Sequence, residues 1–323
     1  MYDNELKALK KSNRFRERIL LDSELIDLGT NDYLGLASDK KQVKKAIKLL
    51  LAQESFAPKA SMLVGGYHMV HALFENELAK LNGFESAIML SSGFLANIAL
   101  VESLVRKGDF LLMDEEFHAS GILATKLIEG RYAFFKHNDL DDLIVDEAHS
   151  SGVLGKNLLG VFDYFGITPK KKHIKMGTLG KAYGSQGAYI LASKEIISFL
   201  ENRAKPIIYS TAPSLFDAAL ALVNLRYIAK NRERFFQKIQ KRQRLVKQIF
   251  GKKIHSLILS IEQKDNQNTQ KIQKALKKQG FFIGAIRQPT VAKPILRIIP
   301  RINISLPQTR EALKFIRDAN DCV

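Results

Sequence analysis

The feature that most constrains the fold of this chain is the alternation of short apolar segments with helical stretches between residues 87 and 209. The apolar segments have the length of strands and lie at 87–90, 110–113, 133–135, 144–146, 173–176, 188–191 and 207–209. The helical stretches, with apolar residues at three- and four-residue steps, are 40–52, 69–81, 96–104 and 122–127. This alternation predicts an α/β fold with a mostly parallel central sheet.

The pattern changes after Ser214, where a helical stretch extends to about residue 250. Strands at 254–261, 281–286 and 296–304 and helices at 269–278 and 307–319 are expected to follow it. We therefore predict a large domain at 41–225 and a smaller C-terminal α+β domain at 226–323. The N-terminal segment 1–40, with a helix at 2–19, is expected to pack with the smaller domain.

The chain is strongly basic, with 50 Lys and Arg against 33 Asp and Glu and a formal net charge of +17. Such a charge can attract an anionic substrate or a nucleic acid. A nucleic-acid site would interleave aromatic with basic residues on one face, and the most basic stretch, 230–253, offers only Phe235, Phe236 and Phe250. We read that stretch as a helix with a solvated basic face and expect no nucleic-acid partner.

No apolar run is long enough to span a bilayer, so we expect no membrane association. The polar N-terminus has no apolar region of the kind that signal peptides carry. Cys322 is the only cysteine, which excludes an internal disulfide and suits a reducing compartment. These features together predict a cytoplasmic protein.

Polar residues follow several predicted strands, where ligands collect in parallel α/β sheets. Asp146 ends the segment Ile144-Val145-Asp146, and His149 comes three residues later. A carboxylate at the end of a buried strand needs a partner. That partner could be a cationic ring nitrogen of a cofactor or, alternatively, backbone amides of the chain itself.

A glycine-rich turn, Gly177-Thr178-Leu179-Gly180-Lys181, follows the strand at 173–176. Here Thr178 could bind a phosphate and Lys181 could form an imine. A P-loop is excluded because Lys175 and Ala182 occupy the places of its first glycine and its Ser or Thr. Ser91-Ser92-Gly93-Phe94, between a strand and a helix, offers either an anion site or a simple N-cap.

Taken together and in this order, these three segments resemble those of the α-oxoamine synthase family of fold-type I enzymes, which use pyridoxal 5′-phosphate (PLP). The resemblance extends from about residue 10 to about residue 318. Further matching motifs are Asn31-Asp32-Tyr33-Leu34-Gly35-Leu36, Gly66-Tyr67-His68 with His71, Asp114 with His118-Ala119-Ser120, Tyr209-Ser210-Thr211 and Arg287-Gln288-Pro289-Thr290-Val291.

The resemblance implies a role for each matching residue. Lys181 would bind PLP as a Schiff base and deprotonate the substrate Cα, Asp146 would pair with the pyridinium nitrogen, and His149 would bond the phenolic oxygen. His118 would stack on the ring. The phosphate would be held by Ser92, Gly93, Phe94 and Thr178, with Ser210 and Thr211 reaching the cofactor of a neighbouring subunit in a homodimer. The substrate residues would be Arg301 for the carboxylate, with Arg297 as runner-up, and Asn31 and Arg16 near the substrate entrance.

The implied reaction is the condensation of an amino acid with an acyl thioester, with loss of carbon dioxide. The segment from Gly66 to His71 favours the biotin-pathway member, which uses L-alanine and pimeloyl-CoA or a pimeloyl carrier protein. The alternative is a sister enzyme that uses glycine or another acyl-CoA. We expect no metal site, because His68, His71 and His118 with Asp146 and Glu147 lack compact ligand spacing.

The chain departs from the family pattern in two places. Residues 57–62 lack two glycines and an arginine of the family's loop. Leu143 runs directly into Ile144, where the family has a strand, a loop and a helix. The loss of a central strand would leave its neighbours unpaired and core surface exposed. The family's site residues in that segment are therefore not assigned in this sequence.

Overall fold

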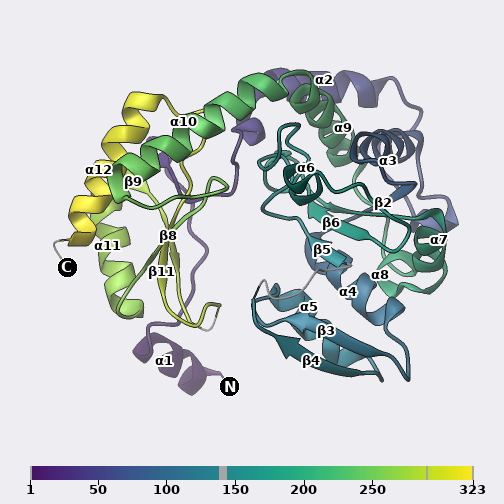
Figure 1. The fold of residues 1–323 in the computed structure, drawn as a ribbon, viewed down its shortest axis with the longest axis horizontal. Helices are drawn as coiled ribbons and strands as arrows, with labels where there is room; N and C mark the ends of the chain where they lie inside the picture. The colour runs from purple at the N-terminus through teal and green to yellow at the C-terminus, as the bar shows by residue number, and fades with distance from the viewer. Residues whose placement is uncertain (1, 138–143, 289, 322–323) are drawn as a thin grey trace. The chain divides into compact units, whose positions relative to one another are not determined.

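The computed structural model describes residues 2–137, 144–288 and 290–321 (Figure 1). The chain divides into two compact units. One unit comprises the residues up to Tyr33 together with those from Gln237 onward, and the other runs from Leu34 to Phe236. The sequence predicts divisions after residues 40 and 225, whereas the structure divides the chain after Tyr33 and after Phe236. Leu143, Pro289 and Cys322, which were named above, lie outside the described residues.

The unit from Leu34 to Phe236 is built on a four-stranded sheet in the order β2 (Ser86–Leu90), β7 (Ala188–Ala192), β6 (Ile174–Thr178) and β5 (Ile144–Asp146). Strands β5 and β6 are parallel, with Asp146 opposite Met176. Strand β7 is antiparallel to both β6 and β2, so β2 points in the same direction as β5 and β6. The predicted α/β fold is confirmed, with β7 as the exception to the parallel arrangement.

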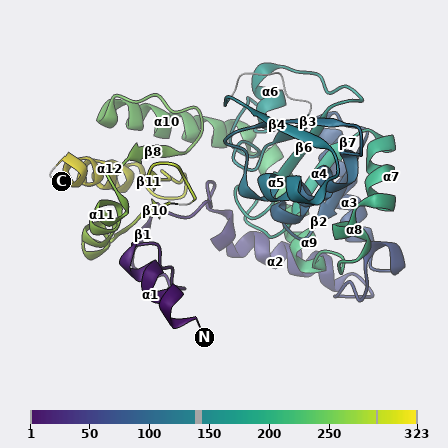
Figure 2. The same ribbon diagram turned by 90° about the horizontal axis from the view of Figure 1, so that it is seen from below.

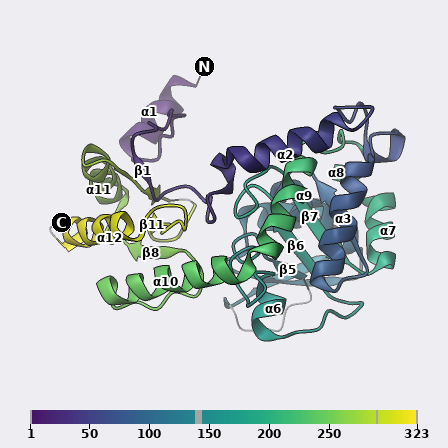
Figure 3. The same cartoon turned by 90° about the horizontal axis from the view of Figure 1, so that it is seen from above.

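Helices cover this sheet, and all of them except α6 and α8 are capped by the side chain of the residue that precedes them. The helices are α2 (Lys40–Leu51), α3 (Met69–Asn82), α4 (Gly93–Leu104), α5 (Ala119–Ala124), α6 (Val161–Phe165), α7 (Lys194–Arg203), α8 (Lys205–Ile208) and α9 (Leu215–Lys230), with short 3-10 turns at Leu36–Ser38, Met62–Val64 and Thr125–Leu127. Helices α4 and α7 pack on the sheet through Leu100, Leu200 and Ile190, all buried. Figure 3 shows α2, α9 and α3 side by side, and α9 contacts both of the others.

One predicted strand and two predicted helices need correction. Residues 207–209 are not a strand: α8 covers most of them, and Pro206 suits its first turn, where no backbone N–H is needed. The stretch from 214 to 250 is two helices, α9 and α10 (Arg232–Phe250), separated at Asn231. The N-terminal helix α1 (Asp3–Lys11) ends well before residue 19, and Asn13 just beyond it has a φ of 54°.

The other unit is α+β, as predicted for the C-terminal part of the chain. Strands β10 (Gly284–Ile286), β11 (Ile295–Ile298) and β8 (Leu259–Glu262) form an antiparallel sheet, and α11 (Asn266–Lys278), α12 (Leu306–Asp321) and the later part of α10 belong to the same unit. Its core includes Leu245, Leu276 and Leu313. Strand β1 (Ile26–Asp27) pairs in parallel with β9 (Phe281–Phe282), which ties the N-terminal segment into this unit.

Strands β3 (Phe110–Asp114) and β4 (Arg131–Phe135) form a separate parallel ribbon (Figure 2). In the part of the chain that the structure describes, neither strand pairs with β5 or with any other strand of the four-stranded sheet. Met113 packs in a small cluster with Val101 of α4 and Ala124 of α5. Phe110 and Leu112, which alternate with Met113, are about half exposed, at 52% and 51%. This is the arrangement expected where a strand between β3 and β5 is missing.

Because the ribbon is covered on one face only, substitutions at two neighbouring positions of β3 should change the free energy of unfolding by very different amounts. Met113→Ala should lower the free energy of unfolding by about 2–5 kcal/mol, because it empties a packed site. Leu112→Ala should change it by less than about 1 kcal/mol and should reduce the binding of an apolar fluorescent dye. Urea denaturation of both variants is the measurement. Equal losses at the two positions would contradict a ribbon that is covered on one face.

Candidate active site

Lys181 and His149 meet at the carboxyl end of the sheet. The Lys181 Nζ lies 2.9 Å from His149 Nε2. Lys181 follows β6 and His149 follows β5, and since these strands are parallel neighbours, the turns after them lie together. Lys181 is half-buried and His149 is exposed, so the amine is held but accessible. The structure thus brings together two residues that are 32 positions apart in sequence.

The turn that carries Lys181 needs glycine at Gly184. This residue has a φ of 56°, in the left-handed region that favours glycine. A Cβ added there would lie 2.5 Å from the backbone nitrogen of Ala37. The turn is closed further by the Leu179 N–H, which donates to the Gly187 carbonyl at 2.8 Å. These contacts hold Lys181 in a fixed place relative to β6.

Asp146 is the last residue of β5 and accepts two hydrogen bonds. The Ala148 N–H donates to Oδ1 at 2.9 Å, and Asn97 Nδ2 donates to Oδ2 at 3.0 Å. Asn97 also donates to Ser120 Oγ at 3.0 Å, and that hydroxyl lies 2.7 Å from His118 Nδ1. A chain of polar contacts therefore connects His118 with Asp146. Sequence reasoning missed Asn97 and Ser120, although Ser120 belongs to the matched motif of His118.

The Ser92 hydroxyl caps α4 by accepting the Leu95 N–H at 3.3 Å. The N-cap interpretation of Ser92 is therefore confirmed, and the same helix end still provides the positive partial charge of an anion site. A Cβ on Gly93 would lie 3.8 Å from Thr178 Cβ, which places Thr178 beside this helix end. Phe94 is 46% exposed.

Ser210 and Thr211 lie beside the same end of β2. Both line a small crevice together with Leu90 and Ser91. Thr211 is exposed and Tyr209 is 79% exposed, so this segment presents a surface of its unit.

His68 and His71 act as caps of α3. The His68 N–H donates to His71 Nδ1 at 3.2 Å, and His68 Nδ1 accepts the Val70 N–H at 3.3 Å. His71 is fully buried, with Nε2 2.9 Å from the Pro213 carbonyl oxygen. Burial lowers the pKa of His71. Their structural interpretation is therefore supported. Among the described residues, no group of three or more His, Cys, Asp or Glu side chains could hold a metal ion.

Glu75 is a buried carboxyl that sequence reasoning missed. It accepts the Met89 N–H at 2.7 Å and the Tyr67 hydroxyl at 2.6 Å. Burial raises the pKa of Glu75 to about 7, and burial with the neighbouring Glu75 raises that of Tyr67. Glu75 thus joins α3 to β2, the strand that leads to Ser92.

Arg301 and Arg297 lie in the smaller unit and differ in their contacts. The Arg301 guanidinium is buried, pairs with Asp27 through Nη1 and donates to Asp32 Oδ2 at 2.6 Å. Its Nε donates to the Asp32 carbonyl at 3.0 Å. Arg297, on β11, donates from Nη2 to the Gly29 carbonyl at 3.4 Å. Its Nε is buried and has no hydrogen-bond partner within the described residues.

Asn31 and Arg16 belong to the same unit as these arginines. The Asn31 Oδ1 is buried and lacks a hydrogen-bond partner among the described residues. Arg16 is exposed, and its Nη2 donates to Thr290 Oγ1 at 2.6 Å.

Comparison with known proteins gives the family of the chain. The family of class I and II aminotransferases matches residues 23–144 and 142–316. This chain belongs to that family. Within the described residues, no helix has both the length and the apolar character needed to cross a membrane.

The curated relatives of this aminotransferase-family chain share one name. The 8-amino-7-oxononanoate synthase of Helicobacter pylori strain 26695 is 39% identical, and the alignment covers 96% of this chain and 95% of the relative. The Aquifex aeolicus protein named putative 8-amino-7-oxononanoate synthase is 34% identical, with coverages of 98% and 96%.

Solved structures have the same fold. A serine palmitoyltransferase of Sphingomonas wittichii has a TM-score of 0.87 at 21% identity, with 99% of this chain and 97% of that chain covered. An 8-amino-7-oxononanoate synthase of Francisella tularensis has a TM-score of 0.74 at 27% identity, with coverages of 93% and 99%.

The comparisons also bear on the junction of Leu143 with Ile144, where this chain lacks a segment of the family pattern. The alignment to the Helicobacter pylori relative spans 355 residues, more than the 323 residues of this chain, so the relative has positions that this chain lacks. The family match falls into two stretches that meet at residues 142–144. This meeting point coincides with the place where β3 and β4 are separated from β5.

Proposed function

We propose that this chain is a PLP-dependent acyltransferase of the 8-amino-7-oxononanoate synthase type. The observation that carries the proposal is the contact of Lys181 with His149 directly after the parallel strands β5 and β6, with Asp146 at the end of β5. The names of the curated relatives support the same activity.

The residues of this site fit PLP chemically. The cofactor has an aldehyde, a ring nitrogen and a phosphate, and the site offers an amine, a carboxylate and a helix N-terminus. When bound, PLP supplies an electron sink for the negative charge that develops at the substrate Cα.

Lys181 would hold the cofactor covalently and, once released, take the proton from the substrate Cα. His149 orients the Lys181 amine through their contact and would bond the phenolic oxygen of the ring. Asp146 would pair with the ring nitrogen and keep it protonated. The contact of His118 with Ser120 fixes its imidazole, which would stack on the ring.

The phosphate would lie at the N-terminus of α4. Ser92, Gly93 and Phe94 begin this helix, and Thr178 stands beside it, so backbone N–H groups, a hydroxyl and the helix dipole would act on the same anion.

We propose Arg297 in place of Arg301 as the guanidinium that receives the carboxylate of the amino-acid substrate. Two carboxylates, those of Asp27 and Asp32, already pair with Arg301 inside its own unit. Arg297 has a buried Nε without a hydrogen-bond partner among the described residues. An unmade hydrogen bond of a buried charged group is costly, and a bound carboxylate would supply it. The roles of Asn31 and Arg16 near the substrate entrance remain part of the proposal.

The proposed reaction joins L-alanine to pimeloyl-CoA or a pimeloyl carrier protein. The acyl carbon bonds to the alanine Cα, coenzyme A or the carrier thiol leaves, carbon dioxide is lost, and 8-amino-7-oxononanoate is released. A sister enzyme that uses glycine or another acyl-CoA would need the same cofactor residues, so assays with each amino acid and thioester distinguish the two.

We further propose a cytoplasmic homodimer. Exposed apolar side chains gather beside the Tyr209-Ser210-Thr211 segment, and α8 contacts the turn Met62–Val64, where Leu63 and Val64 are 50% and 74% exposed. An apolar surface of this kind favours a second copy of the chain. The single cysteine, Cys322, suits a reducing compartment.

Lys181→Ala should lower the rate of product formation from L-alanine and pimeloyl-CoA by at least about 100-fold, because it removes both the covalent anchor and the base. Borohydride reduction of the wild-type protein with PLP, followed by peptide mass spectrometry, should place the cofactor on Lys181. Lys156→Ala, at an exposed lysine of the same unit, is the matched control and should behave as wild type. Cofactor found on another lysine would refute the assignment.

The same substitution at two arginines tests the carboxylate contact. Arg297→Lys should raise KM for L-alanine by roughly 10- to 100-fold with little loss of stability, because a lysine cannot offer the planar fork of donors. Arg301→Lys should mainly lower the free energy of unfolding, since it disturbs buried ion pairs. Steady-state kinetics and urea denaturation separate the two effects. The reverse result would return the role to Arg301.

Mixing two inactive variants tests the shared site. Thr211→Glu would place a carboxylate against the phosphate of the partner's cofactor, and Lys181→Ala removes the anchor. If Thr211 serves the other subunit, subunit exchange puts both lesions in one site of a mixed dimer and leaves the other site intact, so activity returns. If each site is built from one chain, the mixture stays inactive. Each variant alone is the control.

A further inference from the structure

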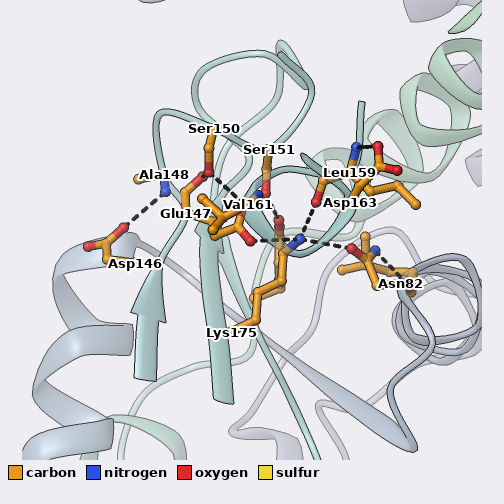
Figure 4. A network of polar contacts seen from close by, with 12 residues as sticks. Asn82, Asp146, Glu147, Ala148, Ser150, Ser151, Leu159, Val161, Asp163 and Lys175 are labelled. Carbon is orange, nitrogen blue, oxygen red and sulfur yellow. Dashed lines mark hydrogen bonds and ion pairs between the residues drawn. The ribbon is translucent and has the colours of Figure 1, made fainter. Parts of the chain in front are cut away.

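Glu147 and Lys175 form an ion pair inside the larger unit (Figure 4). Both side chains have 0% exposure, and Lys175 Nζ lies 3.3 Å from Glu147 Oε1. A buried charge pair of this kind is often no more stabilising than apolar residues of the same volume. The proposed chemistry gives no task to either residue. The role of the pair is therefore inferred from the groups that Lys175 and Glu147 contact.

Lys175 connects three parts of the unit from its place in the middle of β6. Besides Glu147, its Nζ donates to Asn82 Oδ1 at 2.9 Å, at the end of α3, and to the carbonyl oxygen of Leu159. Burial lowers the pKa of Lys175, and the neighbouring Glu147 opposes that shift. Three oxygen atoms around one ammonium group thus hold α3, β6 and the loop that contains Leu159 in one arrangement.

Glu147 closes the loop that follows β5. Its Oε2 accepts the Ser150 hydroxyl at 2.5 Å and the Val161 N–H at 2.7 Å, and its own N–H donates to the Met176 carbonyl at 2.7 Å. Gly160 has a φ of 95°, and a Cβ there would lie 1.6 Å from Glu147 Oε2. The loop from Glu147 to Val161 therefore folds back on a single carboxylate, and only glycine allows the approach at residue 160.

The closed loop and the strand beneath it carry the residues of the candidate active site. Asp146 comes directly before Glu147, and His149 lies within the loop. Lys181 follows Lys175 after the end of β6. The ion pair thus joins the strand that leads to Lys181 to the loop that carries His149, and those two side chains meet at 2.9 Å.

We propose that Glu147 and Lys175 are positioning residues that fix His149 and Asp146 relative to Lys181. The inference rests on the proposed role of Lys181 in binding PLP. In a purely structural role the pair would only stabilise the unit. In a positioning role it also sets how the Lys181 amine and the His149 imidazole lie relative to each other.

The test compares the wild-type protein with Glu147→Gln and with the double variant Glu147→Gln/Lys175→Met. Lys293→Met is the matched control, because Lys293 and its partner Glu262 form an exposed ion pair, with side chains that are 72% and 69% exposed. The measurements are the PLP dissociation constant from absorbance titration, the pH midpoint of the absorbance of Lys181-bound PLP, and the melting temperature of the cofactor-free protein.

Glu147→Gln should weaken PLP binding by roughly 10- to 100-fold, the range found for groups that orient metal-binding side chains. It should also shift the pH midpoint by about one unit, because the contact of Lys181 with His149 changes. The double variant removes the unpaired buried ammonium and should recover melting temperature without recovering the PLP affinity or the midpoint. Lys293→Met should match the wild type in all three.

A double variant that binds PLP with the wild-type constant and midpoint would overturn the inference, and it keeps the test decisive if Glu147→Gln alone does not fold. If the double variant recovers both the melting temperature and the pH midpoint of the wild type, the pair has a structural role only, and the inference is again overturned. A wild-type protein that takes up no PLP on Lys181 would overturn the proposed function, and this inference with it. If the wild-type protein binds PLP on Lys181 and the variants have the same PLP dissociation constant and pH midpoint, only this inference is overturned.

Discussion

The parallel pairing of β5 with β6 is the interaction on which the candidate site depends. Two strands that run in the same direction end at the same edge of the sheet, so the turns after Asp146 and after Thr178 must lie together. The contact between His149 and Lys181 is a direct consequence of this register. The Glu147–Lys175 pair acts below that edge, where it connects the same two strands inside the unit.

Much of this site could be predicted from the sequence because its residues lie in short, dense motifs. Lys181, Asp146 and Thr178 each follow an apolar strand within a few residues, and the structure places these turns together. The strands themselves were recognisable for the same reason, since each is a short apolar run between helical stretches. Local signals of this kind need no knowledge of distant contacts.

The parts that could not be predicted depend on distant partners. A lysine in the middle of a strand gives no sign of the carboxylate, 28 positions earlier, that allows its burial, and Asn97 lies 49 positions from Asp146. The apolar run Ile207–Tyr209 looks like a strand, but Pro206 and the preceding residues place most of it in a helix. Arg301 and Arg297 cannot be distinguished by motif, because only the folded chain shows that Asp27 and Asp32 pair with one of them.

The separation of β3 and β4 from the four-stranded sheet has a consequence for the cooperativity of this unit. A strand within a continuous sheet opens only when its neighbours open, whereas a ribbon held through one face can open by itself at a lower free energy. His118 comes a few residues after β3, and its contact with Ser120 belongs to the polar chain that reaches Asp146. Local opening of the ribbon would therefore move His118 away from the candidate site, while Lys181, Asp146 and His149 stay in place at or after the ends of β5 and β6.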